Sequence, residues 1–218
     1  MRALAAAAAA STVAWSTPAL ATVAAPVAAA LGVPRRLPGP RATLTFDDGP
    51  HRQGTPAVLQ RLEAAGARAI FFLVGEQVDR DPGLAREIAD RGHDVALHGY
   101  RHRLALRVPP RALRHDLDRA HEAIARATGV QADLYRPPYG VFSLATLAEV
   151  RRRGWRPLLW THWGRDWSSA ATPESVAALV LDGLGPGDVV LLHDADHYSA
   201  PGSWRATAGA LDRILPSI

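Results

Sequence analysis

Residues 42–50 read ATLTFDDGP, a short apolar run that ends in two aspartates, a glycine and a proline. A run of this length followed by Gly-Pro is typical of a strand that stops at a turn. Five further apolar runs of strand length follow at residues 68–74, 93–97, 133–136, 156–161 and 188–192. The sequence therefore predicts about six short strands, evenly distributed from residue 42 onward.

Amphipathic segments with helix start and stop signals lie between these runs. Thr55-Pro56, Asp81-Pro82 and Thr172-Pro173 each combine an N-cap residue with proline at the first helical position. Residues 110–128 carry apolar side chains at steps of three and four and stop at Gly129, as a long helix does. Alternating strands and helices predict a parallel sheet, and the number of units favours a reduced or distorted barrel or an open doubly wound sheet.

The N-terminal residues differ from the rest of the chain. Residues 1–30 carry only one charge, Arg2, and resemble a secretory signal with cleavage after Ala21. Because Ser, Thr and Pro interrupt the run, a membrane anchor is less favoured than export. We expect residues 1–40 to be a signal peptide or N-terminal apolar segment plus a Pro/Gly linker. Residues 41–218 are then the folded domain, and the protein is secreted or associated with the cell envelope.

Composition excludes several classes of protein. Of the 218 residues, 48% are hydrophobic and 21% are charged, which is typical of a folded globular chain. No cysteine is present, so the chain has no disulfide and no thiolate metal site. No lysine is present either, which excludes a Schiff-base lysine and a Walker-A loop. The formal net charge of +4 gives no indication of nucleic-acid binding.

Polar residues follow five of the predicted strands. They are Asp47-Asp48-Gly49-Pro50, His98-Gly99-Tyr100-Arg101-His102, Arg136-Pro137-Pro138-Tyr139-Gly140, His162 to Trp167, and His193-Asp194. Since parallel strands end at a common edge, these residues are expected to gather on one rim, where such folds have their active sites.

The residue types on this rim indicate a catalytic metal. The adjacent carboxylates of Asp47 and Asp48 repel each other unless a cation lies beside them. His98 and His102 are spaced so that both imidazoles can reach one ion, and two imidazoles with one carboxylate leave an open coordination position. The glutamate of a zinc-protease H-E-x-x-H motif is missing, which argues against that class.

The remaining groups supply acid and base chemistry. A second carboxylate beside the metal can accept a proton from water, and a separate histidine can donate one to a leaving group. Arg136 can keep the base carboxylate charged and in place, and Asp166 can orient a histidine and favour its protonated form. Together these groups indicate a metal-assisted hydrolase that acts on an amide or ester carbonyl.

The ordered motifs resemble those of the polysaccharide deacetylases, the NodB homology domain of carbohydrate esterase family 4. The matching stretches are TFDDGP at 45–50, HGYRH at 98–102, RPPYG at 136–140, DW at 166–167 and LLHD at 191–194. The resemblance implies an α/β fold, a distorted (β/α) barrel with six or seven parallel strands. It also implies removal of acetyl groups from an N- or O-acetylated polysaccharide of the chitin, peptidoglycan or xylan type.

The resemblance also implies a role for each site residue. By motif position, the implied metal ligands are Asp48, His98 and His102, the base is Asp47, the acid is His193, and their supports are Arg136 and Asp166. The backbone N–H of Tyr139 is the implied oxyanion donor, and Trp167 and Leu191 are the implied walls of the acetyl pocket. We expect Zn²⁺ as the cofactor, with Co²⁺ or Ni²⁺ as alternatives.

Two residues depart from the family pattern, in which Ser or Thr is common at the position of Gly99 and Asp at the position of Trp163. Neither departure removes an implied metal ligand. The expected partner is an acetylated polysaccharide or oligosaccharide, without nucleic acid or a stable protein partner. The alternatives are a related amidohydrolase that acts on a small non-sugar amide and a non-catalytic glycan-binding protein of the same fold.

Overall fold

A parallel sheet forms the centre of the molecule in the computed structural model, which describes residues 15–218. Within these residues the strands are β1 (Thr43–Asp47), β2 (Ala69–Leu73), β3 (Asp94–Leu97), β4 (Leu134–Tyr135), β5 (Arg156–Pro157), β6 (His162–Trp163) and β7 (Val189–His193). Their spatial order is β5-β4-β3-β2-β1-β7-β6, and every neighbouring pair is parallel. The expected distorted (β/α) barrel with six or seven parallel strands is confirmed.

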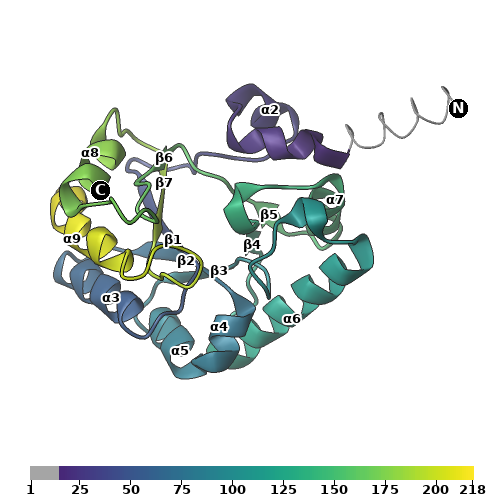
Figure 1. Cartoon of the computed structure of the whole chain (residues 1–218), viewed down its shortest axis with the longest axis horizontal. Helices are drawn as coiled ribbons and strands as arrows, with labels where there is room; N and C mark the ends of the chain where they lie inside the picture. Colours follow the sequence, from purple (N-terminus) through teal and green to yellow (C-terminus); the bar gives the residue numbers. More distant parts are fainter. Residues whose placement is uncertain (1–14) are drawn as a thin grey trace, which may run out of the picture.

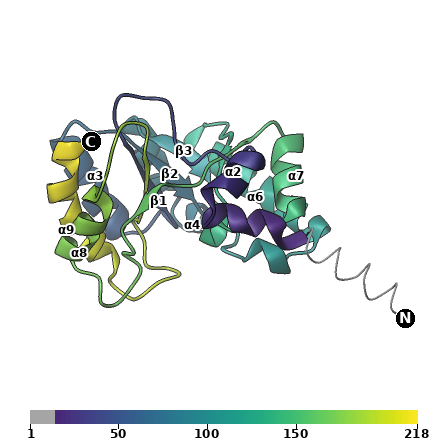
Figure 2. The same ribbon diagram turned by 90° about the horizontal axis from the view of Figure 1, so that it is seen from above.

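Helices surround this curled sheet (Figure 1). They are α2 (Ala25–Ala30), α3 (Gly54–Ala64), α4 (Gly75–Arg80), α5 (Pro82–Asp90), α6 (Pro110–Thr128), α7 (Leu144–Arg152), α8 (Pro173–Leu181) and α9 (Trp204–Ile214), with 3₁₀ turns η1 (Thr17–Thr22), η2 (Ala105–Arg107), η3 (Pro138–Gly140) and η4 (Leu215–Ser217). Seen from above, α3, α8 and α9 lie at one side and α6 and α7 at the other (Figure 2). The predicted helix over residues 110–128 has those bounds and ends at Gly129 with φ of 76°.

The central strands are buried on both faces, which explains why they read as continuous apolar runs. β2 is buried along its whole length, and so is β1 after its first residue. The rings of Phe46 on β1 and Phe71 on β2 stack with centroids 5.1 Å apart. This rigid centre holds the carboxyl ends of β1, β3 and β7 at one edge of the sheet.

The run predicted as one strand over residues 156–161 is a strand only at its start, in β5, and the next strand, β6, begins just after the run at the opposite edge of the sheet. β5 pairs with β4, β6 pairs with β7, and residues 158–161 cross the gap between these two edges. The backbone amides of Leu158 and Thr161 still donate to Tyr135 on β4 and Val189 on β7, and side chains donate to the carbonyls between them. Arg136 donates to the carbonyls of Leu158 and Leu159, and Arg35 donates to the carbonyl of Trp160.

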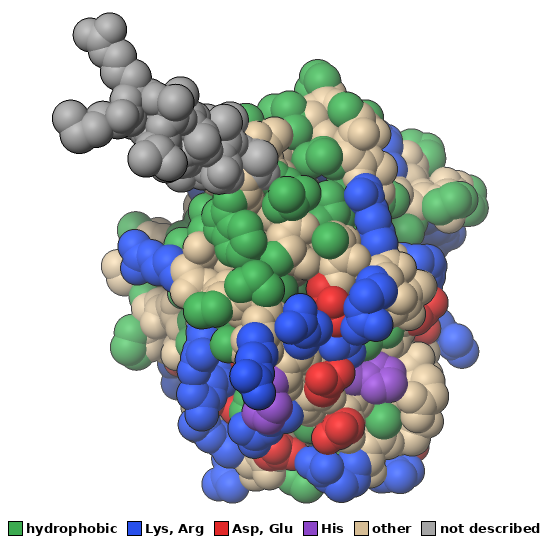
Figure 3. Space-filling view, turned by 90° about the vertical axis from the view of Figure 1, so that its right-hand side faces the viewer, with side chains coloured by type: hydrophobic (Ala, Val, Ile, Leu, Met, Phe, Trp, Pro, Cys, Tyr) green, Lys and Arg blue, Asp and Glu red, His purple; other side chains and the backbone are tan. Residues whose placement is uncertain are grey.

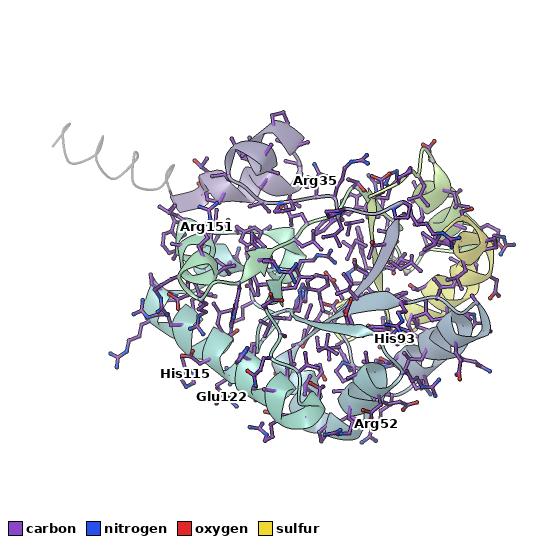
Figure 4. The ribbon with its side chains drawn as sticks, turned by 180° about the vertical axis from the view of Figure 1, so that it is seen from behind. Arg35, Arg52, His93, His115, Glu122 and Arg151 are labelled. Atoms are coloured by element: carbon purple, nitrogen blue, oxygen red, sulfur yellow. The ribbon has the colours of Figure 1, made fainter. Side chains whose placement is uncertain are left out.

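The segment expected to be a linker, residues 31–41, lies against this crossing. The amide of Leu159 donates to the carbonyl of Pro34 over 2.9 Å, and Arg36 forms an antiparallel bridge with Asp188. Figure 4 labels Arg35 near the crossing and Arg151 on α7, whose guanidinium donates to the carbonyl of Leu31. The N-terminal residues therefore cover the gap in the sheet.

The predicted export signal falls largely on residues 1–14, which lie outside the described residues. Ala21, after which cleavage is predicted, is buried within η1, and cleavage there stays a prediction. Among residues 15–218, no helix combines the length and apolar character that a bilayer crossing requires.

Candidate metal centre and active site

A cleft of about 330 Å³ opens at the carboxyl ends of the strands. Eight of the ten predicted site residues line it: Asp47, Asp48, His98, His102, Tyr139, Trp167, Leu191 and His193. The other two, Arg136 and Asp166, are buried and hydrogen-bonded to residues of the lining. The predicted convergence of chain-distant motifs on one rim is thus found in the structure.

Three of these side chains form a potential metal-binding group. The Oδ1 atom of Asp48 lies 3.2 Å from Nε2 of His102 and 3.4 Å from Nε2 of His98. Ligand atoms of all three residues lie within 4.8 Å of one another. The same Oδ1 is buried and makes no hydrogen bond. An unpaired anionic oxygen that faces two imidazole nitrogens matches the donor set of a divalent ion such as Zn²⁺.

The protonation states of these residues suit metal binding. Burial lowers the pKa of His102 to about 4, although the charge of Asp48 opposes this, so the imidazole is neutral at pH 7. Burial acts to raise the pKa of Asp48, but its contact with His98 and the nearby histidine charges outweigh burial and lower it to about 2. Metal ligation needs this combination of a carboxylate with a neutral imidazole.

His98 is oriented by its second ring nitrogen. Leu97 on β3 is in register with Tyr135 on β4, which brings His98 beside Arg136. Nδ1 of His98 lies 2.8 Å from the carbonyl oxygen of Arg136. Since a carbonyl only accepts, Nδ1 carries the proton and the lone pair of Nε2 points toward Asp48.

His102 is held mainly by aromatic contacts. Its ring stacks on Tyr198 with centroids 4.2 Å apart and an interplanar angle of 11°, and the Tyr139 ring meets it at 4.5 Å. The Tyr198 hydroxyl is in turn fixed, because it donates to Glu76 and accepts from Gln77. The sequence pattern did not predict this support, because Tyr198 lies 96 positions away from His102 in the sequence.

A half-buried hydrogen-bonded carboxylate lies beside Gly99, which stands where the family often has Ser or Thr. Asp116 on α6 accepts from the backbone amides of Tyr100 and Arg101 over 2.8 and 3.2 Å. Gly99 adopts φ of 82°, and a Cβ atom there would lie 3.3 Å from Oδ2 of Asp116. The loop that carries both histidines is therefore tied to α6 through Asp116, a residue that the sequence analysis missed.

Asp47 is held by a completely buried arginine. Oδ1 of Asp47 accepts from Nη1 of Arg136 over 2.7 Å, and the same nitrogen donates to Thr45 over 2.8 Å. The other guanidinium nitrogens donate to the carbonyls of Leu158 and Leu159 over 3.2 Å. With its donors occupied, Arg136 fixes the Asp47 carboxylate and neutralises its charge in the protein interior.

His193 is paired with Asp166 behind the cleft. Nδ1 of His193 lies 2.9 Å from Oδ1 of Asp166, whose Oδ2 accepts from the His193 amide and from Thr207, each over 2.6 Å. Burial acts to lower the pKa of His193, but the hydrogen bond and charge of Asp166, with smaller effects of Asp48 and Asp47, raise it to about 10. The imidazole is therefore protonated at neutral pH.

The strand register brings this acid close to the carboxylate on β1. Asp47 on β1 and His193 on β7 are direct register partners on neighbouring parallel strands. A proton acceptor and a proton donor thus face one cleft beside the candidate metal ligands. This arrangement is suited to hydrolysis of a carbonyl compound by general acid-base catalysis.

Aromatic side chains form one wall of the cleft. Trp163 lies between Trp160 and Trp167, with ring centroids 6.0 and 5.1 Å away, and Arg165 lies 5.3 Å above its ring. Trp163 does not contribute to the hydrogen bonds of Asp166, which are made by His193 and Thr207. The aromatic residue at this position therefore widens the apolar wall without weakening the His193 pair.

Comparison with known proteins gives related sequences. A peptidoglycan-N-acetylglucosamine deacetylase of Bacillus cereus is 31% identical over 176 residues, which cover 80% of this chain and 62% of the relative. A chitooligosaccharide deacetylase of Azorhizobium caulinodans is 30% identical over 182 residues, which cover 80% of this chain and 86% of the relative.

The same fold occurs in a family 4 acetyl xylan esterase from Clostridium thermocellum, solved in complex with a cobalt ion. Its TM-score is 0.72 at 28% identity, and the match covers 80% of this chain and 82% of the esterase. The profile of the polysaccharide deacetylase family matches residues 35–158, more than half of the chain. The motifs, the fold and these similarities together lead to one conclusion: the chain belongs to the polysaccharide deacetylase family of hydrolases.

Proposed function

We propose that this protein is a metal-dependent hydrolase that removes acetyl groups from an N- or O-acetylated polysaccharide outside the cytoplasm. The observation that carries the proposal is the convergence of three elements in one cleft. These elements are the Asp48, His98 and His102 group, the Asp47 and Arg136 pair, and the His193 and Asp166 pair. The weakly charged first thirty residues support export.

The metal in this proposal is divalent, with Zn²⁺ preferred over Co²⁺ and Ni²⁺. Its ligands are Asp48, His98 and His102, a donor set of two nitrogens and one oxygen that suits all three ions. When bound, such an ion polarises the acetyl carbonyl and lowers the pKa of a coordinated water.

In the first step Asp47 acts as general base. It accepts a proton from the attacking water while Arg136 keeps its other oxygen in place. The backbone N–H of Tyr139, in a turn with φ of 61°, donates toward the oxygen that becomes negative as the acetyl carbonyl turns tetrahedral. Trp167 and Leu191 enclose the acetyl methyl group.

In the second step His193 acts as general acid. Its proton passes to the sugar nitrogen or oxygen as the bond from that atom to the acetyl carbon breaks, and Asp166 stabilises the imidazolium beforehand. The products are acetate and a free amine or hydroxyl. The names of the two sequence relatives, one a peptidoglycan and one a chitooligosaccharide deacetylase, favour N-acetylated glycans as substrates.

Acetate release from a panel of glycans tests this function. The panel contains acetylated chitooligosaccharides, peptidoglycan, acetylxylan and simple amides, each assayed with a chelator and after return of individual metals. We expect release from at least one glycan, its loss with the chelator and its recovery with a divalent ion. Activity on the simple amides alone would identify a small-molecule amidohydrolase instead. Sugar binding without acetate release in the metal-loaded protein would identify a glycan-binding protein.

A further inference from the structure

A second hollow, separate from the metal cleft, lies beside the loop that carries the two histidines. It has a volume of about 570 Å³ and is lined by residues of that loop and of α6. Its charged lining residues are Arg101, Arg103, Arg111, His115, Asp116 and Arg119. Tyr100, Arg101 and Arg103 line this hollow, whereas His98 and His102 line the metal cleft. The loop over residues 98–103 is therefore a wall common to both.

Positive charge is concentrated at this hollow. Residues 101–119 contain six arginines and two aspartates, so their surplus of four positive charges equals the formal net charge of the whole chain, +4. Figure 3 shows basic side chains gathered over the face formed by α6 and α7, with acidic ones among them, and Figure 4 labels His115 on α6.

None of these six arginines forms a salt bridge with a carboxylate of the described residues 15–218, and three of them line the hollow as exposed side chains. Arg101, Arg103 and Arg111 are exposed and make no ion pair with any residue in the described range 15–218. Arg107 and Arg114 in the same stretch are likewise exposed and without an ion pair among the described residues, whereas Arg126 binds Asp79 and Arg156 binds Asp133. Unpaired guanidinium groups around one hollow are available to bind an anion from solution.

Asp116 and Arg119, which also line the hollow, already make contacts within the protein. Asp116 uses both carboxylate oxygens to accept from the amides of Tyr100 and Arg101. The Arg119 guanidinium lies 3.7 Å above the Tyr100 ring and donates to its hydroxyl. These contacts fix the floor of the hollow, and the free arginines surround it.

We propose that this hollow binds an anionic group, a carboxylate or phosphate, carried by the same glycan whose acetyl group enters the metal cleft. The inference rests on the proposed deacetylase function and names its substrate class, an acidic rather than a neutral polysaccharide. A polymer extends beyond the single sugar at the metal, and only the loop over residues 98–103 separates the two sites. Guanidinium forks match the geometry of carboxylate and phosphate oxygens.

The test compares two forms of one substrate. Acetylated peptidoglycan strands with free carboxylates are assayed beside the same strands after amidation of those carboxylates, with a neutral chitooligosaccharide as reference. The variants are Arg111→Gln and Arg111→Glu, and the matched control is Arg213→Gln on α9, an exposed arginine on the opposite side of the molecule. The readout is kcat/KM on the free-acid strands divided by kcat/KM on the amidated strands.

We expect this ratio to exceed one for the unmodified protein and to fall about threefold in Arg111→Gln, with a larger fall in Arg111→Glu. It stays unchanged in Arg213→Gln and decreases as salt is added, because exposed charges are screened. A second comparison identifies the anion. The value of kcat/KM on amidated strands that keep their phosphate substituents is divided by that on amidated strands stripped of phosphate. A value above one assigns phosphate, and a value of one assigns the carboxylate.

Equal rates on free-acid and amidated strands together with equal rates on strands with and without phosphate, or equal effects of Arg111→Gln and Arg213→Gln, would overturn the inference. If no glycan releases acetate, the proposed function fails, and calorimetric binding of the free-acid and amidated strands to the same variants still tests the anion site. Weaker binding of the free-acid strands by Arg111→Glu alone supports the site, and equal binding by all variants rejects it.

Discussion

The two adjacent carboxylates of Asp47 and Asp48 have different partners in the cleft. Asp48 points its free oxygen at two imidazoles, whereas Asp47 is bound to a buried arginine. Neighbouring side chains along a strand point to opposite sides, but Asp48 lies beyond the strand with φ of 77°, so both carboxylates reach the cleft. The left-handed backbone at Asp48 therefore helps to bring both carboxylates to the same cleft.

This division predicts opposite phenotypes for neighbouring positions. Asp47→Asn keeps the shape of the side chain but removes the proton acceptor, so we expect acetate release to fall about 10²- to 10⁴-fold while metal binding remains. His98→Ala removes a ligand and is expected to lose the metal itself. Metal content by elemental analysis, measured beside acetate release, distinguishes the two. Full activity in Asp47→Asn would show that its carboxylate is not the base.

The His193 and Asp166 pair predicts a specific pH dependence. The pKa of His193 is raised from 6.5 to about 10, so its protonated form, the form that acts as acid, persists through neutral pH. A bound divalent cation nearby opposes this charge and lowers the value. The pKa of His193 is higher in the folded than in the unfolded chain, so protonation of His193 favours the folded state. The pair therefore stabilises the fold fully below about pH 6.5, and this stabilisation is lost as the pH rises through about 10.

Asp166→Asn removes the largest cause that raises this pKa. We expect the alkaline limb of the kcat/KM profile to move to lower pH by about one unit or more, since one pKa unit corresponds to about 1.4 kcal/mol. Thr207→Val, which removes only a hydrogen bond to Asp166, is the milder comparison. An unchanged alkaline limb in Asp166→Asn would assign the acid to another group.

At the scale of elements, α6 supports the metal site from outside. Its residue Asp116 accepts two backbone hydrogen bonds from the loop between His98 and His102. Hydrogen bonds to a charged carboxylate each contribute about 1.5–3 kcal/mol, and less where the group is half-exposed, as Asp116 is. Helix α6 thus helps to fix the loop that carries His98 and His102, although neither histidine lies on the helix.

Asp116→Ala is expected to loosen this loop, because two amides lose their acceptor. We predict a fall in metal affinity of about 10- to 100-fold, the range found for supporting residues of metal sites. Asp118→Ala is the matched control, because Asp118 lies on the same helix but pairs with Arg153 at the surface. Calorimetric metal titration of both variants checks the prediction, and equal affinities would contradict it.

The elements that could be predicted from sequence are those whose signals are local. The helix over residues 110–128 combines a long periodic face with Gly129, and Asp81 accepts from the Leu84 amide as its cap position predicts. By contrast, the short helix α4 and the early end of the strand within residues 156–161 depend on tertiary contacts. The site residues at strand ends could also be predicted, because each directly follows a local apolar run. Asp116 and Thr207 could not, because helix residues far along the chain carry no local pattern that places them beside the site.

At the scale of the whole molecule, residues 21–35 pack against the body of the barrel. Ala21, Ala28 and Val33 are buried, and Pro34 and Arg35 bind the backbone that crosses the open side of the sheet. The predicted domain boundary at residue 41 lies after all of these contacts.

We therefore expect a chain of residues 41–218 to be less stable than one of residues 15–218. Loss of the buried apolar surface and of the hydrogen bonds that residues 15–40 make with the rest of the chain costs about 3 kcal/mol, or about 6–12 °C in Tm for a chain of this size. Differential scanning calorimetry of the two chains tests this, with Arg35→Ala as a milder change that removes one contact. Identical melting temperatures would mean that the segment only rests on the surface.

The open side of the sheet has one more consequence, through Arg136. One end of this guanidinium binds Thr45 and Asp47 on the central strand β1. The other nitrogens donate to the carbonyls of Leu158 and Leu159, in the segment that crosses the open side of the sheet. The Arg136 guanidinium therefore links strand β1 to the crossing segment and also holds Asp47 in place. A change that displaces Arg136 would therefore disturb the proposed base Asp47 and the hold on residues 158–159 together.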